Sequence, residues 1–287
     1  MSKSNRLSKK KQKQHEMSQA NNADRHALYQ KSVQDTETEL TLMVEKYEQL
    51  RGKEPLSFRE DFCGTALLSV DWCKRSDKCT AQGIDLCEDT LAWGKKHNLD
   101  PAGDAVASRV ELKMANVLEV SEPKVDITCA LNFSYSVFKT RDALRQYFEA
   151  AYKGLKDDGV FMLDIFGGTD AIDTNEEDRE VDDETFEFVW DQDKYNPVTN
   201  EILCHIHFKF DDGSKIEKAF TYDWRLWTIA EINELLLEAG FSKVHVYWEE
   251  YADDDDDDEY LEGTGNYIEV NEVEQQESWV SYIFAEA

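Results

Sequence analysis

The sequence alternates short apolar runs with helix-like segments from residue 56 to residue 166, and this alternation constrains the fold more than any other feature. Strands are predicted at residues 56–61, 81–86, 110–114, 125–131 and 160–166, and helices at 66–74, 89–97 and 141–155. Strands separated by helices favour a parallel sheet with helices on both faces. Because the crossovers in such sheets are right-handed, we expect ligands at the carboxyl ends of the strands.

The pattern differs on either side of this region. Residues 1–22 form a basic, polar leader with few apolar residues and are predicted to be a disordered tail. Residues 23–51 have helical periodicity that is broken near Asp35 and ends at Gly52. Residues 169–227 begin with an acidic stretch and then contain three predicted strands, at 186–191, 202–210 and 218–222, which indicates a small antiparallel insert.

The α/β pattern returns in residues 228–287. Thr228 and Glu231 form a capping box that opens a helix, and Gly240 ends that helix. Strands are predicted at 244–248 and 279–284, with an acidic, solvated loop at 252–264 between them. The core of the protein is therefore predicted to consist of residues 23–168 and 228–287, interrupted by the insert at 169–227.

Composition and charge limit the classes of function. A content of 41% hydrophobic residues supports a folded core, and no apolar run has the roughly 20 residues that span a bilayer, so no membrane partner is expected. The formal net charge of −29 repels phosphate backbones, so nucleic acid is not an expected partner either. No signal-peptide-like stretch opens the chain and no Cys-x-x-Cys pair occurs, which predicts reduced thiols and a cytoplasmic location.

Two acidic turns at the ends of neighbouring predicted strands indicate a nucleoside site. The first is Phe58-Arg-Glu-Asp-Phe-Cys-Gly-Thr-Ala66, and the second is Gly83-Ile-Asp-Leu86. A small-residue turn before a helix lets the backbone approach a ligand, and a carboxylate after the next strand can bind two ribose hydroxyls. An isolated Asp85 would favour a helix-capping role, but its place after this turn favours a ligand.

These motifs resemble those of the class I S-adenosylmethionine-dependent methyltransferases, over residues 23–250 and the last strand. In that family the first strand ends in an acidic residue and a turn such as Asp-x-x-Cys-Gly-Thr-Gly, which corresponds here to Glu60 through Ala66. The turn at 155–159 and the helix ending Ala239-Gly-Phe241 also match the family. The resemblance implies an α/β, Rossmann-like, doubly wound sheet of seven strands, with an antiparallel last strand and a small antiparallel β insert.

The resemblance also implies that S-adenosyl-L-methionine is the cofactor. Glu60 or Asp61 would bind its amino group, Asp85 its ribose and Leu86 its adenine, while the leading helix would form a lid over it. The implied cofactor residues are Tyr29, Glu60, Asp61, Cys63, Gly64, Asp85, Leu86, Asn116 and Asn132. No metal is expected, and the two imidazoles of His205 and His207 are predicted to be a structural or surface pair.

The acceptor side is predicted at the end of the fourth strand and in the insert. Asn132 and Tyr135 follow that strand, at the place to which the reactive methyl group should point, and they are the candidate catalytic residues. Asp164 and Phe166 are expected near the rim of the cleft. Resemblance to small-molecule N-methyltransferases implies a pocket for a small-molecule acceptor with an N or O nucleophile, lined by Trp190, Tyr222, Trp224, Arg225 and Trp227. Equally, these aromatic residues could pack the insert onto the sheet.

The sequence leaves other functions open. Phe62 and Ala66 stand where the family has small residues or glycine, which is compatible with a catalytically silent cofactor-binding or activator protein. A protein methyltransferase with a basic substrate would suit the acidic surface. A nicotinamide dehydrogenase would use a similar sheet, but the chain lacks the Gly-x-Gly-x-x-Gly motif.

Overall fold

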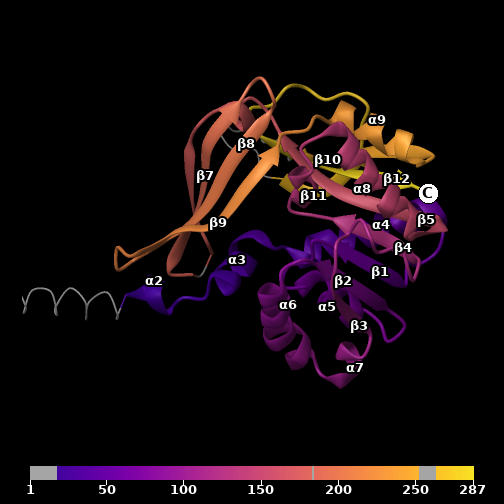
Figure 1. Ribbon diagram of the computed structural model, residues 1–287, viewed down its shortest axis with the longest axis horizontal. Helices are drawn as coiled ribbons and strands as arrows, with labels where there is room; N and C mark the ends of the chain where they lie inside the picture. Colours follow the sequence, from indigo (N-terminus) through magenta and orange to yellow (C-terminus); the bar gives the residue numbers. More distant parts are fainter. Residues whose placement is uncertain (1–17, 183, 252–262) are drawn as a thin grey trace, which may run out of the picture. The chain divides into compact units, whose positions relative to one another are not determined.

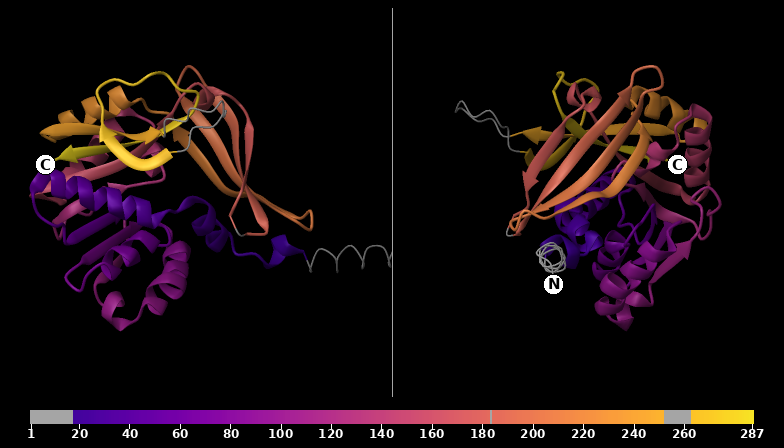
Figure 2. Two further views of the ribbon diagram at one scale, coloured as in Figure 1. Left: turned by 180° about the vertical axis from the view of Figure 1, so that it is seen from behind. Right: turned by 60° about the vertical axis from the view of Figure 1, so that its left-hand side comes forward.

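A computed structural model describes residues 18–182, 184–251 and 263–287, and their elements group into two compact units (Figures 1 and 2). The smaller unit contains the described residues up to Asp35 together with Ile172–Arg225. The larger unit contains Thr36–Ala171 and Leu226–Ala287. Of the leading helical segment predicted at 23–51, the part up to Asp35 is therefore grouped with the insert by its contacts, and the part from Thr36 is grouped with the core.

The larger unit is built on an eight-stranded sheet with the order β11-β10-β12-β5-β4-β1-β2-β3. Neighbouring strands are parallel among β1 (Ser57–Asp61), β2 (Thr80–Asp85), β3 (Val110–Met114), β4 (Val125–Ala130) and β5 (Leu155–Gly167). β12 (Trp279–Glu286) lies antiparallel between β5 and β10 (Lys243–Tyr251). The predicted Rossmann-like fold with an antiparallel last strand is confirmed.

The eighth strand, β11 (Gly263–Glu269), pairs antiparallel with β10 and was not predicted. It contains two glycines and is mostly exposed, so it lacks the apolar alternation by which strands are recognised. It also overlaps the end of the predicted acidic loop at 252–264, of which residues 252–262 lie outside the described part of the chain.

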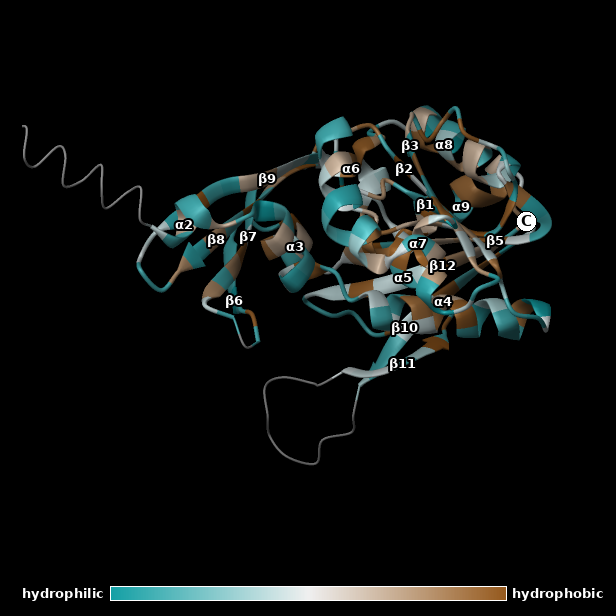
Figure 3. Ribbon diagram, turned by 90° about the horizontal axis from the view of Figure 1, so that it is seen from below, coloured by the Kyte–Doolittle hydropathy of each residue, from teal (hydrophilic) through white to brown (hydrophobic). Residues whose placement is uncertain are grey.

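Helices cover both faces of this sheet. The side chains of β5 show why, because Val160 and Met162 pack with α4 and α5 while Leu163 and Ile165 pack with α8 and α9. A strand buried on both faces has to be apolar throughout, and this one is over 160–163. Figure 3 shows hydrophobic and hydrophilic colours together on α4 and α8, as expected for helices with one buried side. The helical segments of this unit are α4 (Thr36–Arg51), α5 (Leu67–Lys74), α6 (Glu88–Gly94), a π-helical turn (Lys95–Leu99), η2 (Asp100–Ala102), α7 (Asp104–Ala107), η3 (Ser134–Val137), α8 (Arg141–Lys153), η4 (Asp170–Ile172, whose last residue belongs to the smaller unit) and α9 (Ile229–Ala239).

The predicted helix boundaries agree with the capping chemistry. The leading helical segment is interrupted at Gln34–Asp35, and Gly52 closes α4 with a φ of +67°. The Thr228 hydroxyl and the Glu231 carboxylate form the capping box of α9, and Gly240 follows that helix in the left-handed conformation.

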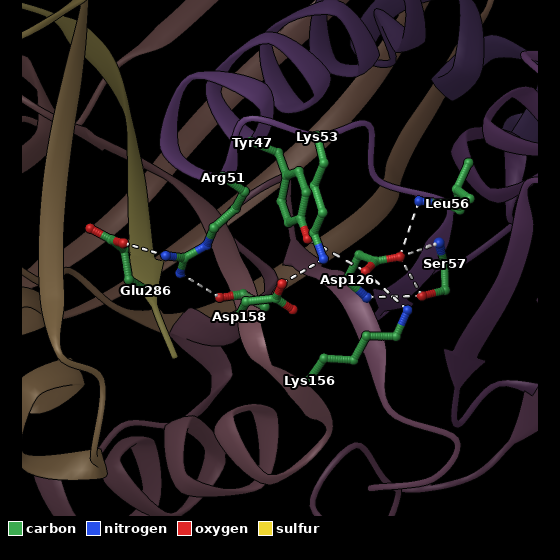
Figure 4. A network of polar contacts seen from close by, with 10 residues as sticks. Tyr47, Arg51, Lys53, Leu56, Ser57, Asp126, Lys156, Asp158 and Glu286 are labelled. Atoms are coloured by element: carbon green, nitrogen blue, oxygen red, sulfur yellow. Dashed lines mark hydrogen bonds and ion pairs between the residues drawn. The ribbon is translucent and has the colours of Figure 1, made fainter.

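The amino ends of β1 and β4 are fixed by one buried carboxylate (Figure 4). Asp126 accepts hydrogen bonds from the backbone N–H groups of Leu56 and Ser57, at 3.0 and 2.8 Å, and from the Ser57 hydroxyl. Lys156 donates to its other oxygen at 2.9 Å. Burial raises the pKa of Asp126, but these hydrogen bonds, led by that from Lys156, outweigh it and hold the pKa below its usual value.

The smaller unit is an antiparallel sheet with helical residues of the leading segment packed on its apolar face. Its strands have the order β6 (Glu176–Glu180), β7 (Phe186–Asn196), β8 (Glu201–Phe210) and β9 (Lys215–Arg225). Leu28, Tyr29 and Val33 of α3 (Arg25–Val33) pack against this face. β6 was missed because its five residues are all charged and exposed. Of the predicted tail, residues 1–17 lie outside the described residues and Gln19–Asn22 form the short helix α2.

Within the described residues, no helix has both the length and the apolar character needed to cross a bilayer.

Candidate functional site

β1 presents its three charged residues to opposite faces of the sheet. Side chains alternate along a strand, so Arg59 and Asp61 point one way and Glu60 the other. Arg59 forms a two-pronged ion pair with Asp61, at 2.7 and 3.1 Å, and also donates to the carbonyl groups of Val117 and Val120. The Tyr147 hydroxyl donates to Asp61 at 2.9 Å. Asp61 is thus engaged in a buried structural network.

Glu60 is the acidic residue that this arrangement leaves for a ligand. Its Oε2 atom accepts hydrogen bonds from the backbone and the hydroxyl group of Ser69 on α5, and within the described residues both bonds reach that one oxygen. Burial raises the pKa of Glu60 to about 8, against the effect of Ser69. A buried carboxyl group with an unused oxygen would be stabilised by a cation, such as an ammonium group.

The turn after β1 adopts the backbone conformation of a glycine-rich turn although two of its positions are not glycine. Phe62, Gly64 and Ala66 all have positive φ, at 58°, 52° and 54°. The Cys63 N–H donates to the Ile84 carbonyl at 3.0 Å, which ties the turn to β2. The Cys63 thiol is buried against Gly83, and burial raises its pKa well above the usual range. Cys63 therefore packs the turn onto β2.

Asp85 joins this turn to the next one. Its carboxylate accepts the Gly64 N–H at 2.9 Å and the Cys87 N–H at 2.7 Å, so it bonds to the residue that precedes α6 and not to the first turn of that helix. Beside it, Leu86 and Met114 are 71% and 61% exposed, and Met114 is the cross-strand partner of Asp85. An exposed apolar pair next to a carboxylate suits a nucleoside, with the apolar surface for the base and the carboxylate for the sugar.

Asn116 follows β3 at the same edge of the sheet. Its side-chain oxygen accepts the Leu118 N–H at 3.1 Å, which stabilises the local turn. An amide oxygen has a second lone pair, so its predicted interaction with an adenine amino group stays compatible with this contact.

The loop after β4 contains the two candidate catalytic residues in very different settings. The backbone N–H groups of Asn132 and Phe133 donate to the two oxygens of Asp164 on β5. Tyr135 is only 1% exposed and packs in the core with Phe148. Burial, and then the nearby Asp164, raise the pKa of Tyr135 well above its usual range. This packing favours a structural role for Tyr135, whereas a role for Asn132 stays a prediction.

The predicted acceptor residues and Tyr29 gather in the smaller unit. Trp190, Tyr222 and Trp224 form one cluster, in which the Tyr222 and Trp224 ring centres are 4.3 Å apart and lie 6.0 and 6.3 Å from that of Trp190. Tyr29 bonds to the Tyr222 hydroxyl. Arg225 ends β9 and is half-buried. Trp227 lies instead in the core of the larger unit. Sequence reasoning thus identified an aromatic cluster, whose contact with an acceptor stays a prediction.

His205 and His207 lie on the other face of the small sheet among polar partners. His205 contacts Thr221 at 2.9 Å and Lys218 at 3.0 Å, and His207 contacts Asp191 at 3.1 Å. The Lys218 N–H also donates to His207. These contacts account for the pair as part of the polar packing of the strands.

Two features of the candidate site were missed from the sequence. Met114 was assigned only to a strand, because its place opposite Asp85 depends on the pairing of β2 with β3, which the sequence pattern does not give. Asp164 was placed at the cleft rim without a role, because its partners are backbone groups 31 and 32 residues away. Only the pairing of β4 with β5 brings them together.

Comparison with known proteins agrees with this fold. A S-adenosylmethionine-dependent methyltransferase from Clostridium acetobutylicum is 15% identical, with a TM-score of 0.66, and the match covers 91% of this chain and 96% of that chain. CalS10, an amino pentose methyltransferase from Micromonospora echinaspora, is 14% identical, with a TM-score of 0.63 and coverage of 91% and 95%. The sugar N-methyltransferase KedS8 from Streptoalloteichus is 14% identical, with a TM-score of 0.60 and coverage of 92% of each chain.

No protein-family model matches the sequence, and no curated protein matches it. At the identities above, the structural likeness establishes the Rossmann-like methyltransferase fold.

Proposed function

We propose that the protein is an S-adenosylmethionine-dependent methyltransferase that acts on a small molecule. The observation that supports this most directly is the turn after β1, in which three left-handed residues bring the Gly64 N–H onto the carboxylate of Asp85. This geometry gives the backbone close access to a ligand while the strand-end carboxylate keeps lone pairs for ribose hydroxyls.

The chemistry of the surrounding groups fits S-adenosylmethionine. Glu60 offers a buried carboxylate oxygen to the ammonium group, Asp85 suits the ribose, and Leu86, Met114 and Asn116 suit the adenine. When bound, the cofactor supplies a methyl group that its sulfonium already activates. The chain then has to orient the acceptor and exclude water, and proximity of this kind can contribute several kcal/mol, on the order of 7–11 in favourable cases.

The acceptor is proposed to be a small molecule with an N or O nucleophile. Two of the structurally similar proteins are an amino pentose methyltransferase and a sugar N-methyltransferase, so amino sugars are the first acceptors to test. The aromatic cluster of Trp190, Tyr222 and Trp224 is proposed as the acceptor surface, because aromatic rings bind the apolar face of a sugar or a cationic amine.

Isothermal calorimetry with S-adenosylmethionine, S-adenosylhomocysteine and NADH tests the cofactor. We expect both sulfur nucleotides to bind and NADH not to bind. Asp85→Ala should weaken S-adenosylmethionine binding by about tenfold or more, whereas Asp89→Asn, at an exposed position on α6, should leave it unchanged. Binding of NADH alone, or equal effects of the two variants, would contradict the proposal.

Transfer of a labelled methyl group to a panel of amino sugars, other amines and hydroxyl compounds tests the reaction. Product formation supports a methyltransferase. Cofactor binding without transfer to that panel or to basic proteins would instead support the catalytically silent alternative, which the non-glycine residues Phe62 and Ala66 leave open. Transfer to basic proteins alone would support a protein methyltransferase.

A further inference from the structure

The loop that follows β4 is held in an unfavourable backbone conformation. Asn132 and Phe133 are consecutive non-glycine residues with φ of 54° and 56°. Side chains disfavour this left-handed region, and two such residues in succession persist only where the surroundings fix them. The loop also carries Asn132, the residue predicted to lie beside the transferred methyl group.

One buried carboxylate fixes this conformation. Asp164, near the end of β5, accepts the Asn132 N–H through Oδ2 at 2.7 Å and the Phe133 N–H through Oδ1 at 2.9 Å. Successive backbone N–H groups that point at one anion form a nest, a small concave site that binds negative charge. Here each of the two Asp164 oxygens accepts one of the two N–H groups, so both bonds are made only when both oxygens can accept. The Phe133 ring packs on Phe166, two residues beyond Asp164, with ring centres 4.6 Å apart. The loop is therefore attached to β5 by backbone and side chain together.

In the described part of the chain, the titratable groups that face Asp164 are two tyrosines and a thiol, none of which carries a positive charge. The Tyr135 hydroxyl of η3 and the Cys129 thiol of β4 both interact electrostatically with its carboxylate. Tyr282 is the cross-strand partner of Asp164 on β12. Among the described residues, no ion pair reaches Asp164. Burial raises its pKa to about 7, against the lowering effect of the two N–H groups. The charge that closes the nest thus titrates near neutral pH.

We propose that Asp164 is a positioning residue for methyl transfer, whose ionised carboxylate holds the loop with Asn132 in the conformation that faces the cofactor methyl group. This inference rests on the proposed function. Protonation converts one acceptor oxygen into a hydroxyl, so the loop loses one of its two hydrogen bonds below neutral pH. The site is then expected to be well formed only above about pH 7.

The test uses the whole protein and compares Asp164→Asn with Asp157→Asn, an exposed acid on the same strand. Amide hydrogen exchange and amide proton shifts of Asn132 and Phe133 are measured from pH 5.5 to 9. The bound methyl resonance of methyl-¹³C-labelled S-adenosylmethionine is followed in the same samples.

In the wild type and in Asp157→Asn, we expect protection of the two amides to rise roughly tenfold or more as the pH passes through 7, with a parallel change in the bound methyl resonance. In Asp164→Asn both should be low and independent of pH. Protection of these amides that does not vary with pH in the wild type would overturn the proposal, even if the variant unfolds.

The methyl resonance separates the two proposals. The amides could titrate as expected while the bound methyl resonance stays constant and equal in all three proteins. That result would make Asp164 purely structural and overturn its positioning role. A complete lack of a bound methyl signal in the wild type would reject the proposed function instead, and with it the role of Asp164 in methyl transfer. The amide titration would still show whether Asp164 closes the nest.

Discussion

Single residues at the end of β1 and in the turn after it have features that destabilise the folded state. Glu60 is buried without a cationic partner among the described residues, and Phe62 and Ala66 hold left-handed conformations that favour glycine. A protein optimised for stability alone would avoid both features, since each destabilises the folded state by roughly 1–3 kcal/mol. Their concentration in one turn is the residue-scale argument for function.

Glu60→Gln should stabilise the ligand-free protein at high pH. Burial raises the pKa of Glu60 in the folded state to about 8, above its value in the unfolded state, so the folded protein favours the protonated form. This difference stabilises the fold at low pH, and the contribution is lost as the pH rises towards about 8. The glutamine amide keeps an acceptor for Ser69 but never ionises. Urea unfolding should show a gain of about 1–3 kcal/mol at pH 9 and little change at pH 5.

The same substitution should weaken S-adenosylmethionine binding by about tenfold or more, because a charge-assisted hydrogen bond is lost. Calorimetry at pH 8 measures this change. Unchanged affinity would remove Glu60 from the cofactor site, and a loss of stability at every pH would show that its charge stabilises the fold.

Ala66→Gly should make the protein more stable by about 0.5–1 kcal/mol, because Ala66 has φ 54° and ψ 31° at the start of α5. The matched control is Ala92→Gly, at an exposed position within α6, which should lose about 1 kcal/mol. Thermal unfolding compares the two. A loss of similar size in both variants would mean that this position does not favour glycine. The backbone of the turn would then give no reason to compare it with the glycine-rich turn of the methyltransferases.

At the scale of elements, the regular core was predictable and the additions were not. β3 was predicted over the residues that it occupies, and the boundaries of α5 and α8 differ from prediction by one or two residues, because periodicity and caps are local signals. β6 and β11 were missed because they are polar and gain their strand conformation from pairing with β7 and β10. Strand pairing is a tertiary interaction that residue patterns in a single exposed strand do not encode.

The junction of β1, β4 and α4 gives a prediction at this scale. Asp126 has a lowered pKa, so its stabilising contribution is present above the usual carboxyl range near pH 4 and is lost as the pH falls through its folded-state value. Asp126→Asn should therefore destabilise the protein at pH 7 by about 1–3 kcal/mol and by less at acid pH.

Urea unfolding at several pH values measures this difference, with Asp157→Asn as the control for loss of an exposed negative charge. Equal destabilisation at all pH values would indicate that the shape of the side chain matters more than its charge.

At the scale of the whole molecule, the net charge of −29 opposes the compact state. Salt screens this repulsion and should therefore raise the melting temperature. Between about 20 and 500 mM NaCl we expect a rise of a few degrees, which corresponds to a gain of about 1 kcal/mol in the free energy of unfolding. Sodium sulfate at equal ionic strength separates this effect from ion-specific ones. A melting temperature that falls with NaCl would show that local ion pairs, such as Arg51 with Glu286, outweigh the overall repulsion.

The division into units is also a property of the whole molecule. The insert was predicted at 169–227 and the smaller unit contains 172–225, but that unit also includes the described residues up to Asp35. Periodicity showed that the segment with Leu28 and Val33 has an apolar side. It could not show which surface covers that side, because apolar contact is not directional.

The sequence by itself determined the α/β class and the two turns at Glu60–Ala66 and Asp85, because local periodicity and turn chemistry specify these. The antiparallel last strand was expected only from the resemblance to a known family. Only the tertiary structure decided that Asp61 is held by Arg59 and Tyr147 while Glu60 keeps an oxygen for a ligand. It alone decided that Phe62 and Ala66 keep the glycine-type backbone and that Asp164 fixes the loop of Asn132. The physical reason is clearest for Asp61 with Tyr147 and for Asp164 with the loop of Asn132: the partners of these buried carboxylates lie far away in the chain, and only the tertiary fold brings them together.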